Sequence, residues 1–170
     1  MNPRHLKGSP NWGTPAWLAA MCREVMTGDP CGQIDLDPCS TPEQNQVVNA
    51  AAYYTAEQDG LVCPWYGDML INPPGGLVRE FWNRLVTHRA SIRQAIWIGF
   101  SLEHLRTCQS PALSLLDLAL CVPKRRIAFV PPPGKTGASP THANVIGYLA
   151  GTVDHAYRFR RVFAEIGVVR

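Results

Sequence analysis

The sequence lacks the patterns that mark zinc proteins, secreted proteins and membrane proteins. Its six cysteines, at positions 22, 31, 39, 63, 108 and 121, include no Cys-x-x-Cys pair and have no histidine at zinc-ligand spacing. Residues 1–7 contain no apolar segment of a signal peptide, and no apolar run approaches the ~20 residues of a membrane-spanning helix. We therefore expect no metal site, free thiols and a cytoplasmic protein.

Charged residues are also few. They make up 17% of the 170 residues, the net charge is +3, and hydrophobic residues make up 46%. This composition is ordinary for a globular chain and excludes a disordered one, while the small positive charge permits a polyanionic partner without requiring it. No internal repeat is present. We expect a single domain over residues 1–170, with residues 1–10 flexible.

Residues 69–76 read Met-Leu-Ile-Asn-Pro-Pro-Gly-Gly and predict a strand that stops abruptly. Pro73 and Pro74 cannot continue a β ladder, so the strand delivers Asn72 to the edge of a sheet. The amide oxygen of Asn72 and the carbonyl oxygen of Pro73 would each accept a hydrogen bond from a planar amino group, such as that of a nucleobase. A simple strand-ending turn is the alternative interpretation.

Asp35 and Asp37 alternate with apolar residues in a second short strand, which Pro38 ends. In open α/β sheets, ligands bind at the carboxyl ends of the strands. We therefore expect these carboxylates to bind ribose hydroxyls or an ammonium group. Capping of the next helix, expected at 42–51, is the alternative, above all for Asp35.

The segment before the first helix carries another group of candidates. Thr14 and Pro15 are typical of a helix cap and first turn, and they precede an amphipathic stretch at 16–26. Trp12 would either pack against the core as a staple or form the wall of a site for a flat ligand.

An aromatic segment leads into the strand that ends at Asn72. Asp59 and Gly60 predict a turn, and Trp65 and Tyr66 follow it. These rings would either pack under the turn or form a wall for a base.

Strands and helices alternate along the rest of the chain, which predicts an α/β fold with a mostly parallel sheet and helices on both faces. The expected elements are a helix at 77–89, a strand at 95–100, a helix at 101–107 and an apolar segment at 112–122 that ends as a strand. Strands at 127–130 and 143–150 would form an antiparallel pair at the C-terminal end. Residues 155–170 fit either a strand or a helix.

Cations gather near the first strand of that pair. Lys124, Arg125 and Arg126 precede it, and Lys135 lies in the polar loop that follows. They would contact phosphates or form a solvated face.

Five segments in this order resemble the phage-type DNA adenine-N6 methyltransferases, the Dam-like family. They are Asn11-Trp12-Gly13-Thr14-Pro15, the segment 34–40, the segment 59–61 with Trp65, Asn72-Pro73-Pro74, and the segment 125–129. The likeness covers most of residues 9–150. It implies a compact Rossmann-like methyltransferase fold, S-adenosylmethionine as cofactor, DNA as partner, and methyl transfer to the N6 amine of adenine. It also implies a phage or prophage origin, and hence the cytoplasm of a host cell.

The resemblance also implies roles for individual residues. The catalytic motif corresponds to Asn72, Pro73 and Pro74. The expected cofactor-binding residues are Trp12, Thr14, Pro15, Asp35, Asp37, Pro38, Cys39 and Asp59. Two of them, Trp12 and Asp35, come from the residue patterns described above. The expected substrate-binding residues are Trp65, Tyr66, Gly75, Lys124, Arg125, Arg126 and Lys135.

Gly75 stands where the family motif has Tyr, Phe or Trp. Trp65, Tyr66 or Trp82 would then stack on the target base in place of the missing ring. Gly75, and the absence of a glycine-rich fingerprint after Asp37, favour an alternative: a non-catalytic nucleic-acid-binding protein on the same fold. Methylation of the N4 amine of cytosine uses the same chemistry, and a small-molecule methyltransferase is the remaining alternative.

Overall fold

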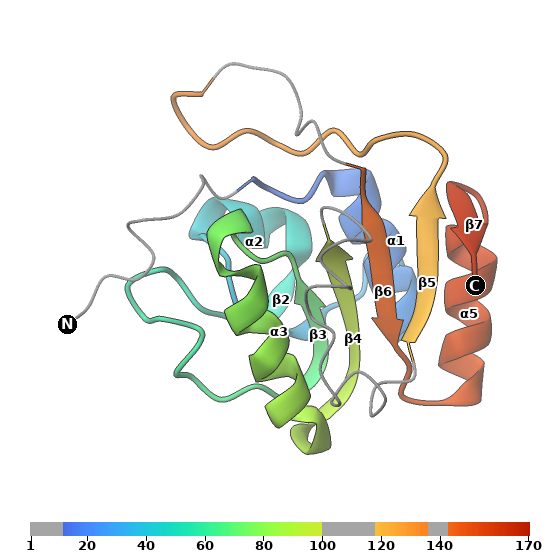
Figure 1. Ribbon diagram of the computed structural model, residues 1–170, viewed down its shortest axis with the longest axis horizontal. Helices are drawn as coiled ribbons and strands as arrows, with labels where there is room; N and C mark the ends of the chain where they lie inside the picture. Colours follow the sequence, from blue (N-terminus) through green and yellow to red (C-terminus); the bar gives the residue numbers. More distant parts are fainter. Residues whose placement is uncertain (1–11, 100–117, 136–142) are drawn as a thin grey trace.

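All strands of the described chain join one sheet. The computed structural model describes residues 12–99, 118–135 and 143–170. The helices are α1 (Ala16–Thr27), α2 (Pro42–Val48), α3 (Val78–Thr87) and α5 (Val153–Phe163). The strands are β1 (Ile34–Asp37), β2 (Ala50–Tyr53), β3 (Gly67–Ile71), β4 (Ile92–Gly99), β5 (Leu118–Pro123), β6 (Val145–Leu149) and β7 (Gly167–Val169). The strand order is β2-β1-β3-β4-β6-β5-β7 (Figure 1).

The first half of the sheet is parallel. β2, β1, β3 and β4 run in one direction, and Leu36 pairs with Ala52 on one side and with Met69 on the other. β3 and β4 each contain an apolar run, at 69–71 and 95–98, as expected for strands that are covered on both faces, whereas β1 alternates apolar residues with aspartates. Within β3, Met69 and Leu70 belong to different core clusters, because successive side chains point to opposite faces.

Helices cover both faces of the sheet. α3 lies on the opposite face of the sheet from α1 (Figure 1). One core cluster contains Leu18 of α1 and Phe159 of α5, and the other contains Phe81 and Trp82 of α3. α2 lies beside α1, where the Arg23 guanidinium donates to the carbonyl of Val47. The expected α/β class, mixed sheet and helices on both faces are therefore confirmed. None of the described helices is long and apolar enough to cross a membrane.

The antiparallel end of the sheet differs from the expected pair. β6 runs antiparallel between β4 and β5, and β7 adds to β5. The expected strand at 127–130 is wrong, because only Val130 forms a bridge there, with Gly13. The polar and exposed Lys124, Arg125 and Arg126 interrupt the run after β5, and the partner of β6 is the apolar stretch before them.

Two further boundaries differ from the sequence-based expectation. The helix expected at 42–51 ends at Val48, because Asn49 takes the left-handed conformation, with φ 58°, and β2 begins at Ala50. The segment 155–170, left open between helix and strand, contains both, α5 and β7. The expected flexible residues 1–10 and the helix at 101–107 lie outside the described residues.

The strand order has a switch point between β1 and β3. The chain leaves β1 toward one side to form β2, and then crosses back to place β3 on the other side of β1. In open α/β sheets, the crevice outside the carboxyl ends of two such strands is the usual ligand site. Here those ends carry Asp37 and Asn72.

Candidate functional site

The ends of β1 and β3 are in direct contact. The Cys39 thiol donates a hydrogen bond to the backbone carbonyl of Asn72, with an Sγ to O distance of 3.2 Å. Pro38 and Pro73 are both buried beside this contact. The structure thus brings together the two proline-terminated strand ends that the sequence marked independently.

The side chain of Asn72 is held in one orientation. It is 8% exposed, and its Nδ2 donates to the carbonyl oxygen of Trp12 at 2.8 Å and to the Thr14 hydroxyl at 3.2 Å. A carbonyl oxygen only accepts hydrogen bonds, so the atom facing Trp12 is the amide nitrogen. The remaining atom, Oδ1, has no hydrogen-bond partner among the described residues, and it is left as an acceptor at this site.

The segment that carries Thr14 is itself fixed by a distant part of the chain. Gly13 exchanges two backbone hydrogen bonds with Val130, at 2.7 and 2.8 Å. A Cβ atom at Gly13 would lie 2.3 Å from Nε2 of Gln44 and 3.2 Å from Cβ of Val130, so a larger residue here would require the Gln44 side chain to move. This bridge fixes the backbone next to Thr14, which is 4% exposed and contacts Asn72.

Thr14 does not cap α1. The residue at the cap position is Pro15, without a side-chain hydrogen bond, and the Thr14 hydroxyl accepts from Asn72 instead. The expected cap is thus corrected to a contact within the site. The Trp12 side chain packs against the core cluster of α1, in agreement with the staple alternative.

Asp37 is a buried carboxylate at the end of β1. It is 5% exposed, and its Oδ1 accepts a hydrogen bond of 3.1 Å from the backbone N–H of Cys39. Burial raises the pKa of Asp37 to about 6, and the Cys39 N–H only partly offsets this. Such a group accepts hydrogen bonds readily, and a cation would keep it ionised.

The Asp59–Gly60 turn packs on the end of β1. Asp59 has φ 55°, and its Oδ1 accepts from the N–H of Leu61. A Cβ atom on Gly60 would lie 1.9 Å from the carbonyl oxygen of Pro38, so the turn sits directly on the strand end. The three cofactor-binding segments implied by the resemblance, at 12–15, 37–39 and 59–60, therefore meet at one edge of the sheet.

The side chain of Trp65 contacts this turn. Its indole nitrogen donates to the carbonyl of Gly60 at 2.7 Å, and its side chain is 1% exposed. Trp82 is equally buried in the same core cluster, whereas Tyr66 is 41% exposed. Of the three rings considered for stacking on a base, Trp65 and Trp82 are core residues and only Tyr66 presents a surface.

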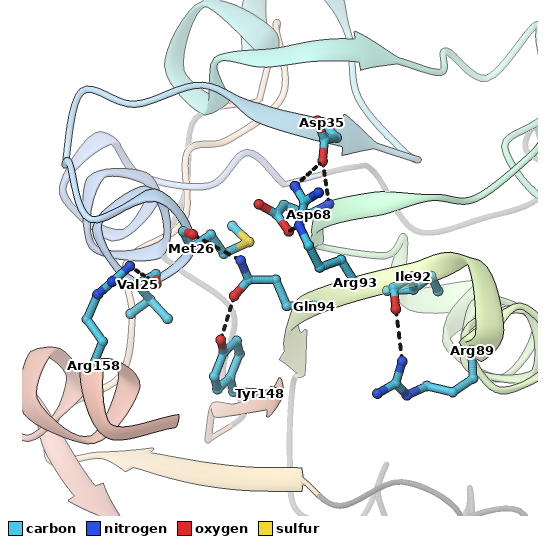
Figure 2. Close-up of polar contacts among 10 residues, drawn as sticks. All are labelled: Val25, Met26, Asp35, Asp68, Arg89, Ile92, Arg93, Gln94, Tyr148 and Arg158. Carbon is cyan, nitrogen blue, oxygen red and sulfur yellow. Dashed lines mark hydrogen bonds and ion pairs between the residues drawn. The ribbon is translucent and has the colours of Figure 1, made fainter. Parts of the chain in front are cut away.

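Asp35 lies away from the site. It accepts hydrogen bonds from the Asp68 N–H and from Arg93, both at 2.8 Å, and Arg93 also pairs with the Asp68 carboxylate at 2.6 Å (Figure 2). These three are the second residues of β1, β3 and β4. Asp35 is therefore committed to an ion-pair network near the amino ends of the strands, and its expected grouping with Asp37 is corrected.

A cavity of about 400 Å³ opens beside Thr14. Its volume is in the range of small-molecule sites. The residues around it come from the segment before α1, from α2 and from the segment after Val130: Gly13, Thr14, Thr41, Glu43, Gln44, Val47, Val130, Pro131, Pro132 and Pro133. Sequence reasoning missed this cavity, although the three consecutive prolines marked a fixed, extended backbone.

The remaining expected substrate-binding residues are Gly75 and four cations. Gly75 begins a short 3-10 turn after Pro74 and is half-buried. The side chains of Lys124, Arg125 and Arg126 are exposed around a second cavity, and Lys135 is exposed near the end of its described segment. In the part of the chain that the structure describes, no three His, Cys, Asp or Glu side chains are placed to hold a metal ion.

Comparison with protein-family models gave no match, and comparison with curated proteins gave none either.

Proposed function

We propose that this chain is an S-adenosylmethionine-dependent DNA methyltransferase that acts on the exocyclic N6 amine of adenine. The observation that carries the proposal is the amide oxygen of Asn72, presented without a partner among the described residues at the switch point of the sheet. An acceptor in that place suits an amino group, and Asn72 begins the motif that resembles the catalytic motif of the family.

The chemistry requires positioning more than a nucleophilic side chain. The lone pair of an exocyclic amine is delocalised into the ring, which makes the nitrogen a poor nucleophile. Hydrogen bonds from its two N–H groups to Asn72 Oδ1 and to the Pro73 carbonyl would favour a pyramidal nitrogen with its lone pair directed at the methyl donor. Pro74 limits the motion of that carbonyl, because its ring restricts the backbone before it.

The polar groups at the strand ends suit the proposed cofactor. Thr14, Pro15, Asp37, Pro38, Cys39 and Asp59 would hold it. The buried Asp37 carboxylate matches a ribose hydroxyl or an ammonium group, and the cavity beside Thr14 has the volume of a small-molecule site. When bound, S-adenosylmethionine supplies an electrophilic methyl group on its sulfonium.

DNA as the second substrate is supported by exposed cations. Lys124, Arg125, Arg126 and Lys135 are all exposed on the segment that follows β5. A base in a duplex must leave the stack to reach Asn72, at a cost of about a few kcal/mol. Tyr66, the one exposed ring among the three candidates, would stack on it.

One observation favours a second candidate, a non-catalytic nucleic-acid-binding protein. Gly75 has no ring, and Trp65 and Trp82 are buried in the core, so two of the three replacements for the missing ring are absent from the surface. Under this alternative the cations bind DNA but no methyl group is transferred. Cytosine N4 methylation would use the same acceptors, and analysis of the product nucleoside separates it from adenine methylation.

The experiment is a calorimetric titration with S-adenosylmethionine, followed by transfer of a labelled methyl group to DNA of mixed sequence. We expect binding in the micromolar range and label in N6-methyladenine. Asn72→Ala should abolish transfer, whereas Asn83→Ala, at an exposed position of α3, should leave it unchanged. Absence of cofactor binding, both with and without DNA, would overturn the proposal in favour of the non-catalytic candidate.

A further inference from the structure

A second cavity, of about 280 Å³, lies at the start of α1 and is bordered by the cationic segment. Trp17, in the first turn of α1, forms one side of it and is 46% exposed. Lys124, Arg125 and Arg126 border it as well. The cavity therefore combines an exposed indole with three cations.

The backbone of the cationic segment is anchored at both ends. The N–H of Lys124 donates to the carbonyl of Ile166 at 2.8 Å, and the N–H of Ile127 donates to Oδ1 of Asn144 at 2.8 Å. Ile127 is 2% exposed. The three cationic side chains are thus presented from a fixed stretch of chain, with apolar residues beneath it.

These cations are available to a ligand. None of Lys124, Arg125 and Arg126 forms an ion pair with another described residue. Glu165 also borders the cavity, and it is the one carboxylate in the lining. Three positive charges against one negative charge favour an anionic ligand, while Trp17 and Ile166 offer it an apolar surface.

We propose that this cavity binds an unpaired nucleotide of a DNA strand, with its base stacked on Trp17 and the adjoining phosphates paired with Arg125, Arg126 and Lys124. Proteins that bind single strands combine these two features, a stacking ring and a positively charged track. An unpaired base is required because the faces of a paired base are covered by its neighbours in the duplex. The inference rests on the proposed function, since it names the part of the DNA that flanks the target.

The position of Trp17 connects this subsite to the candidate catalytic site. Trp17 is three residues after Thr14, whose hydroxyl contacts Asn72. The segment 124–130 runs from the cations to Val130, which bridges to Gly13. A DNA strand bound at Trp17 would therefore pass close to the acceptor at Asn72, as expected for a nucleotide next to the one that is methylated.

Intrinsic fluorescence tests the proposal without cofactor. Trp65, Trp82 and Trp97 are at most 2% exposed and Trp12 is half-buried against the core, so Trp17 contributes the largest share of quenching by a ligand at the surface. On titration with a 12-nucleotide single strand of mixed sequence, we expect quenching in the wild-type chain, most of this quenching lost in Trp17→Leu, and binding by that variant about tenfold weaker. Tyr157→Leu is the matched control, because Tyr157 is an exposed ring on α5.

Salt dependence tests the cations. Each phosphate contact to a single strand contributes about 0.7 to the slope of log K against log salt, so Arg125→Ala with Arg126→Ala should reduce the slope by about 1.4. Arg170→Ala is the control. Arg170 is exposed, and its backbone pairs with Leu120, four residues before Lys124, so its substitution should not change the slope. Wild-type quenching in Trp17→Leu, an unchanged slope in the double variant, or equal quenching by a fully paired duplex would overturn the proposal.

Titration with S-adenosylmethionine distinguishes this inference from the proposed function. If the single strand quenches Trp17 but the cofactor does not bind, the proposed function fails while the nucleotide site stands. If the cofactor binds and methyl transfer occurs, but Trp17→Leu binds and quenches like the wild type, the nucleotide site alone is wrong.

Discussion

The amide nitrogen of Asn72 donates a hydrogen bond to the Thr14 hydroxyl, although the two residues are 58 positions apart in the chain. The same nitrogen donates to the carbonyl of Trp12 at 2.8 Å. This arrangement requires a donor at the position facing Trp12. It also leaves the amide oxygen as the acceptor of the site.

Asn72→Asp should therefore inactivate this chain. A carboxylate oxygen would replace the amide nitrogen and face the carbonyl of Trp12, so two acceptors would meet. We expect methyl transfer to be lost and the free energy of unfolding to fall by about 1–3 kcal/mol. Methyl-transfer assays and urea denaturation check this, and an Asn72→Asp variant with wild-type activity and stability would refute it.

Thr14→Val should weaken the same contact with little change of shape. Thr14 is 4% exposed, and valine replaces its hydroxyl with a methyl group of similar size. One N–H of Asn72 would lose its acceptor, which we expect to cost about 1 kcal/mol of stability and to reduce methyl transfer about fivefold. Thr14→Ser keeps the hydroxyl and should retain most of the activity. If Val and Ser variants behave alike, the hydroxyl is not what positions Asn72.

The sequence predicted the elements that carry the site better than it predicted their contacts. The strand ends at Asp37 and Asn72 were identifiable because a proline stops each apolar run, and parallel strands bring such ends to one edge. The contact between Asn72 and Thr14 was not predicted, because it depends on the bridge between Gly13 and Val130, which no local pattern encodes. Residue spacing alone carries no information about such distant pairings.

The role of Asp35 shows a second limit of sequence patterns. Alternation placed Asp35 and Asp37 on one strand, but two positions along a strand are about 7 Å apart. Asp37 reaches the carboxyl edge, while Asp35 meets Arg93, 58 positions away. Trp65 was likewise identified as an aromatic of the site region, yet its burial depends on the 3-10 turn and helix that follow Asn72 and could not be read from nearby residues.

Asp35→Asn should leave cofactor binding unchanged, whereas Asp37→Asn should weaken it at least about tenfold. Asn at position 35 still accepts the Asp68 N–H and loses only a partly exposed ion pair, worth less than about 1 kcal/mol of stability. Calorimetric titration of both variants with S-adenosylmethionine gives the comparison. Equal losses of affinity in the two would return Asp35 to the cofactor site.

Arg93→Met should destabilise the chain more than Asp35→Asn does. The Asp68 side chain is only 10% exposed, and its carboxylate pairs with Arg93 at 2.6 Å (Figure 2). Removal of Arg93 leaves a largely buried carboxylate without its partner, which we expect to cost about 1–3 kcal/mol. Urea denaturation measures it, and the added change Asp68→Asn should recover part of the loss. No recovery would show that Arg93 stabilises the fold through other contacts.

Tyr148→Phe should destabilise the folded chain, because it removes one bond from a buried chain of hydrogen bonds. The Tyr148 hydroxyl donates to Oε1 of Gln94 at 2.5 Å, and Nε2 of Gln94 donates to the carbonyl of Met26 at the end of α1 (Figure 2). Burial raises the pKa of Tyr148, so its hydroxyl stays protonated and remains a donor. Phenylalanine leaves the Gln94 oxygen unsatisfied, at an expected cost of about 1–3 kcal/mol. A double variant with Gln94→Met should lose less than the sum of the single variants, and strict additivity would argue against the chain.

The buried carboxyl of Asp37 should make the chain less stable as pH rises through the acid range. Its pKa is about 6 in the folded chain, against an ordinary value of 3.8. Between these values the folded chain holds a proton that the unfolded chain has released, so the free energy of unfolding falls with rising pH, by up to about 3 kcal/mol.

Asp37→Asn removes that titration and keeps an acceptor for the Cys39 N–H. We therefore expect it to flatten the stability profile between about pH 4 and 6 and to be more stable than the wild type at pH 7, while it binds the cofactor poorly. Urea denaturation at pH 4.5, 5.5 and 7 gives the profile, with Asp154→Asn, at an exposed position of α5, as the control. If the free energy of unfolding of Asp37→Asn depends on pH in the same way as that of the wild type, ionisation of Asp37 does not destabilise the folded chain, and the prediction is wrong. A gain in stability together with a loss of binding would instead show that this carboxylate is kept for its ligand, at the expense of the fold.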